Sequence, residues 1–225
     1  MIKKCRINVD SVFKSELSKL NNVNANNYGV RQKPSNFRKN LEEFLENSNV
    51  NLLADSITLR DKDIRNYFFK GDDDFKVFLS HSSQDKEIVY KFASYLNSEG
   101  ISTFVDSMVW DNYRDLLDRL GANLNERERL NLVAHLHIIL ASSLTYMIDK
   151  CKCFIFLASE NSISNGIYTF SPWIYHELLT ASIIQTKDTT LKESFAHESL
   201  KVQYGIPFID RFALIKFSDI VRWIG

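Results

Sequence analysis

The stretch FKVFLSHSSQDKEIVYKFASYLNSEGISTFV, residues 75–105, decides the fold class. It begins with a short apolar run, residues 75–80, that is typical of a buried strand. Apolar residues at helical spacing follow until Gly100: Ile88, Phe92, Ala93 and Leu96. A second apolar run occupies residues 101–105. A strand, a helix and a strand within about 30 residues predict a βαβ unit, and therefore a parallel sheet with a right-handed crossover.

The same alternation continues toward the C-terminus. We expect a helix over residues 130–150 and a third strand over residues 151–157. Another helix begins at Ser171-Pro172, because Ser is a preferred N-cap and Pro a preferred first helical residue, and it runs to about residue 185. Residues 212–217 are the expected last strand. Alternating strands and helices predict an α/β fold with a doubly wound, flavodoxin-like parallel sheet.

Composition excludes several classes of protein. The 225 residues carry 28 Lys and Arg against 28 Asp and Glu, so the chain lacks the positive charge that non-specific nucleic-acid binding needs. With 44% apolar residues, 7 Gly and 3 Pro, it is neither collagenous nor disordered. We see no signal peptide and expect no membrane span. The three cysteines form no plausible disulfide framework, so a cytoplasmic protein is expected.

The chain is expected to have two parts, residues 1–73 and 74–225. The first part is polar and contains one marked helical stripe, formed by Phe37, Leu41, Phe44 and Leu45. An acidic run at residues 71–74 interrupts the pattern, and the strand and helix alternation begins after it. We therefore predict a helical N-terminal extension followed by an α/β domain.

Polar residues that follow the predicted strands mark the candidate site, because open parallel sheets bind ligands at the carboxyl ends of their strands. They are Ser80, His81 and Ser82 after the first strand, Asp106 and Trp110 after the second, and Trp173 and Glu177 in the helix that begins near residue 171. The serines and histidine could instead only cap a helix, and Glu177 could only complement a helix dipole. Residue positions alone leave both readings open.

Several familiar sites are missing from the sequence. It contains no G-x-G-x-x-G, no P-loop, no G-x-S-x-G and no H-E-x-x-H motif, which disfavours Rossmann dehydrogenases, P-loop NTPases, α/β-hydrolases and zincins. His135 and His137 would point to opposite sides of a helix, and Cys151 and Cys153 would be buried on a strand. We therefore predict no metal site.

Four segments together resemble the bacterial type of TIR (Toll/interleukin-1 receptor) domain. They are VFLSHSSQDK at residues 77–86, GISTFVD at 100–106, FIFL at 154–157 and SPWIYHE at 171–177. Their order agrees with that family over roughly residues 74–217. The chain departs from the family in a long insertion, residues 107–132, between the second and third strands.

The resemblance implies an NAD⁺-consuming enzyme that works without a metal or another cofactor. Glu177 takes the place of the catalytic Glu in the W-x-x-x-E helix that Trp173 opens, and Phe78 matches an aromatic residue near the ligand. The segment from Asp106 resembles the loop beside the site, and an aromatic residue such as Trp110 or Phe78 could hold the nicotinamide. Similar proteins act in Thoeris-type anti-phage defence. Self-association through TIR surfaces and a separate effector that reads the product are the implied partners.

The proposed chemistry needs only one carboxylate. Nicotinamide leaves NAD⁺ as a neutral molecule, so it needs no general acid, unlike the oxygen leaving groups of ordinary glycosidases. Glu177 would stabilise the positive ribosyl fragment, which water or an internal nucleophile then captures to give linear or cyclic ADP-ribose. Two other functions stay open: a TIR adaptor that only assembles with partners, and a nucleoside deoxyribosyltransferase-like enzyme.

Overall fold

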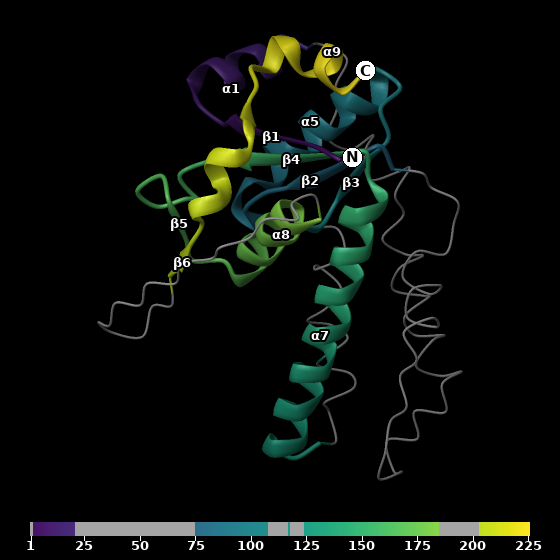
Figure 1. Ribbon diagram of the computed structural model, residues 1–225, viewed down its shortest axis with the longest axis vertical. Coiled ribbons are helices and arrows are strands. Elements are labelled where there is room, and N and C mark those ends of the chain that lie inside the picture. The colour runs from purple at the N-terminus through teal and green to yellow at the C-terminus, as the bar shows by residue number, and fades with distance from the viewer. Residues whose placement is uncertain (1, 21–74, 108–116, 118–123, 185–202) are drawn as a thin grey trace.

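A parallel sheet of five strands forms the centre of the protein (Figure 1). The computed structural model describes residues 2–20, 75–107, 117, 124–184 and 203–225. The strands follow the order β3-β2-β4-β1-β7, and all neighbouring pairs are parallel. Their bounds are β1 Lys3–Asn8, β2 Val77–Ser80, β3 Thr103–Val105, β4 Cys153–Ala158 and β7 Ala213–Leu214. The α/β class with a parallel sheet, predicted from residues 75–105, is confirmed.

The helices between these strands lie close to where the sequence places them. A short 3₁₀ turn, η1 (Ser83–Asp85), leads into α5 (Lys86–Ser98), which ends before Gly100 in the left-handed region at φ +76°. Helix α8 spans Pro172–Ile183. Helix α7 spans Glu126–Lys150 and begins four residues earlier than predicted. Asn125 explains this early start, because it forms a capping box with Glu128.

The first strand corrects the predicted division of the chain. β1 lies between β4 and β7, with Lys3 opposite Cys153 and Cys5 opposite both Ile155 and Ala213. Helix α1 (Ser11–Ser18) follows it, capped by Asp10. Residues 2–20 are therefore part of the α/β domain, and a helical extension over residues 1–73 is wrong for this stretch. The stripe from Phe37 to Leu45 lies outside the described residues.

The N-terminal strand completes an order that is compatible with a doubly wound fold. The sequence analysis counted β2, β3 and β4 as the first, second and third strands and β7 as the last. In that count the spatial order is second, first, third, β1 and last. This is the flavodoxin-like 2-1-3-4-5 order with β1 in the fourth place. A strand from the start of the chain thus fills the position that the alternating pattern leaves between the third strand and the last.

Two layers of helices cover the two faces of the sheet (Figure 1). Helices α1 and α5 cover one face together with η3 (Phe217–Asp219) and α9 (Ile220–Ile224), around a core that contains Phe92 and Ile7. Helices α7 and α8 and the 3₁₀ turn η2 (Pro207–Arg211) cover the other face, around Phe78, Phe154 and Phe156. A small antiparallel pair, β5 (Tyr168–Thr169) with β6 (Tyr204–Gly205), lies beside α8. The candidate site belongs to the α8 face.

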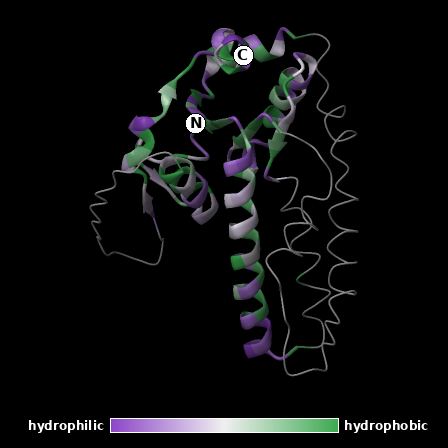
Figure 2. Cartoon of the chain, turned by 45° about the vertical axis from the view of Figure 1, so that its right-hand side comes forward, coloured by the Kyte–Doolittle hydropathy of each residue, from purple (hydrophilic) through white to green (hydrophobic). Residues whose placement is uncertain are grey.

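Helix α7 extends well beyond the sheet, with green and purple residues interspersed along it (Figure 2). Residues 131–148 contain no Lys, Arg, Asp or Glu. The sequence analysis, which expected no membrane span, did not take this uncharged stretch into account. By length and composition alone, this one helix of the described part of the chain could cross a membrane; its apolar window has a mean hydropathy of 1.4. Core helices of soluble proteins meet the same criterion, and 35% of the window is buried here.

Candidate active site

The site is built where β2 and β3 end and α8 begins. Ser80 is the last residue of β2, and Asp106 follows β3 directly. Both are buried, with 0% and 5% of their surfaces exposed. Because parallel strands end at the same edge, β2 and β3 bring the hydroxyl and the carboxyl group together.

Glu177 enters the site from α8. Ser171 caps this helix by accepting a hydrogen bond from the Ile174 amide, and Pro172 starts it. Ile174 and Leu178 pack on the sheet, which fixes the rotation of the helix and turns Glu177 inward. Its side chain is fully buried, with 0% exposed.

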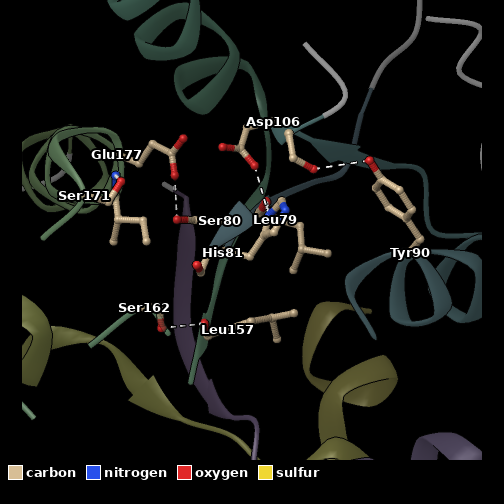
Figure 3. Close-up of polar contacts among 12 residues, drawn as sticks. Leu79, Ser80, His81, Tyr90, Asp106, Leu157, Ser162, Ser171 and Glu177 are labelled. Atoms are coloured by element: carbon tan, nitrogen blue, oxygen red, sulfur yellow. Dashed lines mark hydrogen bonds and ion pairs between the residues drawn. The ribbon is translucent and has the colours of Figure 1, made fainter. Parts of the chain in front are cut away.

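Two polar contacts connect these elements (Figure 3). The Ser80 hydroxyl donates a hydrogen bond of 2.6 Å to Oε2 of Glu177, and Nδ1 of His81 lies 3.0 Å from Oδ1 of Asp106. The carboxyl groups of Glu177 and Asp106 face each other above the end of β2 in the same view. The structure thus brings together four of the predicted site residues, and it adds a pairing of two carboxyl groups that the sequence analysis did not predict.

The surroundings favour the protonated form of Glu177. Burial raises the pKa of Glu177 most, and the negative charge of Asp106 raises it further, while the hydrogen bond from Ser80 partly opposes both effects. The pKa of Glu177 therefore lies well above its ordinary value. The protonated form is therefore more favourable for this carboxyl than for an exposed glutamate.

Two buried polar atoms at the site lack hydrogen-bond partners among the described residues. They are Oε1 of Glu177 and Nε2 of His81, whose side chain is also 0% exposed. Leaving such groups unsatisfied costs about 1–3 kcal/mol each, so native proteins keep few of them. Their presence beside the carboxyl pair is typical of a site that binds or transforms a ligand.

The other predicted site residues have different positions. Phe78 is fully buried in the core, stacked on Phe154 with ring centres 5.5 Å apart, so it supports the site from below rather than lining it. Ser82 caps η1 by accepting from the Gln84 amide. The Trp173 ring lies edge-on to His137 of α7, 5.4 Å away. Trp110 lies outside the described residues.

Glu177 is shielded from solvent, next to a contact between α7 and α8. The Glu177 side chain has no exposed surface, and α7 contacts α8 through Thr145, whose Oγ1 lies 3.1 Å from Nε2 of His176. His176 directly precedes the buried glutamate.

Metal and thiol chemistry find no support in the described part of the chain. No three His, Cys, Asp or Glu side chains there are grouped as a metal ion would require. The three cysteines are free and buried. Burial raises the pKa of Cys151 to about 12, and the pKa of Cys5 and Cys153 is raised as well, so these thiols pack as small apolar side chains.

Comparisons with known proteins add no relative. No family model, no curated protein and no solved structure matches the chain. The case for a function therefore depends on the residues of the site and on their geometry.

Proposed function

We propose that this protein is a cytoplasmic TIR-type enzyme that cleaves the bond between nicotinamide and ribose in NAD⁺, with Glu177 as its catalytic residue. The observation that carries the proposal is the fully buried Glu177, hydrogen-bonded to Ser80 and facing Asp106 where the parallel strands end. A hydrolase or cyclase of this kind would serve antiviral defence, either by depleting NAD⁺ or by making a product that a separate effector reads.

A cationic substrate suits a carboxyl pair that shares protons. The nicotinamide–ribosyl end of NAD⁺ is positively charged, and a positive charge near Glu177 and Asp106 favours their ionised forms. Binding would therefore lower the pKa of Glu177 and release its proton. The resulting carboxylate then lies where positive charge develops on the ribose.

The reaction balances without a cofactor. The bond between C1′ and the nicotinamide nitrogen breaks, and both bonding electrons move to that nitrogen and cancel its charge. Water attacks C1′ from the free side and loses a proton to give ADP-ribose, or a ring nitrogen of the adenine attacks to give a cyclic product. Asp106, whose carboxyl group faces that of Glu177 (Figure 3), would accept the proton that water releases.

A second candidate function follows from the proton on Glu177. The bases of ordinary nucleosides are neutral before cleavage, so they leave readily only when an acid protonates them. Burial and the charge of Asp106 favour the protonated form of Glu177, which would make such an acid available. A nucleoside deoxyribosyltransferase-like enzyme would use the pair in this way.

One incubation separates these functions. The purified protein is mixed with NAD⁺, or with deoxyadenosine plus a free pyrimidine, in the presence and absence of extract from phage-infected cells. The products are separated and identified by mass spectrometry. Release of nicotinamide with linear or cyclic ADP-ribose supports the proposal. Exchange of the base supports the transferase. If neither substrate reacts, with or without the extract, the adaptor function is left.

A further inference from the structure

Arg6 lies on the same face of the sheet as the candidate active site. In the parallel register, Phe156 of β4 is opposite Ser80 on one side and opposite Arg6 of β1 on the other. Residues opposite each other in adjacent strands point to the same face, and Phe156 belongs to the core under α8. Ser80 and Arg6 therefore face α8 together, about 10 Å apart across two strand spacings.

The charge of Arg6 is not neutralised within the described part of the chain. Its side chain is half-buried, its Nε is buried without a hydrogen-bond partner, and it forms no ion pair there. A buried Nε without a hydrogen bond is unfavourable, and Arg is the side chain best suited to bind phosphate through two parallel hydrogen bonds. The position of Arg6 is therefore well suited to an anion.

Two more cations contribute to the field around Arg6. Lys4 is two residues away on the same face of β1, and its Nζ donates to the carbonyl oxygens of Ala181 and Ser182, at 3.1 and 3.4 Å. Burial, and next the positive charge of Arg211, lower the pKa of Lys4. Arg211 is therefore near enough to add its own charge to this part of the sheet.

The α8 face of the sheet is consequently polarised. The carboxyl groups of Asp106 and Glu177 lie at one end of the row that includes Ser80 and Phe156, and Arg6 lies at the other. NAD⁺ has the complementary polarity, because its nicotinamide–ribosyl end is cationic and its diphosphate is anionic. One ribose separates these two ends, so a substrate with its cationic end at the carboxyl pair would direct its diphosphate toward β1.

We propose that Arg6 binds the diphosphate of the substrate, in a positive field that Lys4 and Arg211 strengthen. This anion site rests on the proposed function for the identity of the substrate. It adds a recognition residue from the N-terminal strand, which lies outside the segments that carry the TIR resemblance. The site explains why a half-buried arginine lies between buried Cys5 and Ile7 on a central strand.

Binding of ADP-ribose, inorganic pyrophosphate and adenosine, measured by calorimetry, tests the anion site. The proteins are the full-length parent, Arg6→Gln and Arg6→Lys. The matched control is Lys152→Met, which removes an exposed cation just before β4, at the end of the sheet where the strands begin. We expect Arg6→Gln to weaken ADP-ribose and pyrophosphate at least ~10-fold and to leave adenosine unchanged. Arg6→Lys should restore part of the loss, and Lys152→Met should bind like the parent.

Other outcomes overturn one proposal or the other. The anion site is wrong if the parent does not bind pyrophosphate or ADP-ribose, or if Arg6→Gln binds them like the parent. It is also wrong if Arg6→Gln melts well below the parent, because an arginine that forms no ion pair with the described residues should not stabilise the fold. Arg6-dependent binding of pyrophosphate without nicotinamide release from NAD⁺ keeps the anion site and removes the proposed function. If Arg6→Gln releases nicotinamide from NAD⁺ as fast as the parent, the proposed function is kept and the anion site is removed.

Discussion

Glu177 combines two properties that a structural role does not require. It is fully buried, and it faces a second carboxyl group, so its ionisation is unfavourable in the closed protein. Glutamates are rarely buried in this way unless they are paired with a cation or do chemistry. The hydrogen bond from Ser80 holds the group in one place and satisfies only one of its oxygens.

The raised pKa of Glu177 predicts how stability depends on pH. The native state holds a proton that the unfolded chain releases at lower pH, so the free energy of unfolding falls as pH rises from the ordinary pKa of a glutamate to the raised one. Glu177→Gln resembles the protonated form and should remove this fall. Melting temperatures measured from pH 4 to 9 should decline more steeply for the parent than for the variant, and parallel curves would contradict the assignment.

Asp106 should control the pH dependence of activity. Its negative charge is the second largest cause of the raised pKa of Glu177, after burial. Asp106→Asn removes that charge at nearly constant shape, so the rising limb of kcat/KM for NAD⁺ should move to lower pH. The profiles are normalised to their maxima, because the variant also loses a contact with His81. A limb at unchanged pH would show that Asp106 does not act on Glu177.

The residues of the site could be predicted, but not how they pair. Ser80, His81, Asp106 and Glu177 follow strands or open a helix, and parallel strands end together, so sequence order alone places them at one edge. Which side chains touch depends on the rotation of α8, which Ile174 and Leu178 set by packing on the sheet. The rotation of α8 cannot be predicted from the spacing of residues in the sequence. This rotation makes the carboxyl group of Glu177 face that of Asp106.

At the scale of elements, the strands with continuous apolar runs were predictable and β1 was not. β2 and β4 are buried on both faces and therefore appear as VFLS and CFIFLA. β1 has the sequence KKCRIN, in which Lys4 and Arg6 alternate with buried Cys5 and Ile7. Its two cations face the α8 layer, so the strand lacks the apolar run that identifies its neighbours. Its partner Ile155 in β4 is 150 residues from Cys5, and its partner Ala213 in β7 is 208 residues from it, beyond the reach of any local pattern.

The central position of β1 predicts that it is essential for stability. Ile7 is 2% exposed in the core under α1 and α5, so Ile7→Ala should lower the free energy of unfolding by about 2–5 kcal/mol. Val12→Ala is the matched control, because Val12 is 62% exposed on α1 and should change stability by less than about 0.5 kcal/mol. Denaturant unfolding checks both values, and a tolerated Ile7→Ala would mean that β1 is dispensable.

A cut in the chain offers an independent check on β1. Strand β1 is held by β4 and β7, and Phe13 of α1 packs against Phe92 and Phe217. After cleavage between residues 20 and 75, the N-terminal fragment should stay bound through size-exclusion chromatography under native conditions. If the fragment is released and the melting temperature is unchanged, residues 2–20 are not needed by the sheet, and the predicted separate N-terminal extension would be correct after all.

At the scale of the whole molecule, one face of the sheet holds the polar groups and the other holds the larger apolar core. The layer of α1, α5 and α9 surrounds apolar side chains such as Leu79 and Phe92. The layer of α7, α8 and η2 packs on the face to which Ser80, Glu177 and Arg6 belong, around an aromatic core of its own. Buried, partly unsatisfied polar groups on this face are expected of the enzyme that we propose, and a protein that only assembles with partners would not need them.

The most direct test compares nicotinamide release from NAD⁺ by the parent, Glu177→Gln and a matched control, Glu160→Gln, which changes an exposed glutamate just beyond β4. Because Gln keeps the shape and loses the charge, we expect Glu177→Gln to release nicotinamide at least ~10²-fold more slowly while its melting temperature at neutral pH stays at or above that of the parent. Glu160→Gln should match the parent. A Glu177→Gln protein that is folded and cleaves NAD⁺ as fast as the parent would contradict the central claim that this buried carboxyl is the catalytic group.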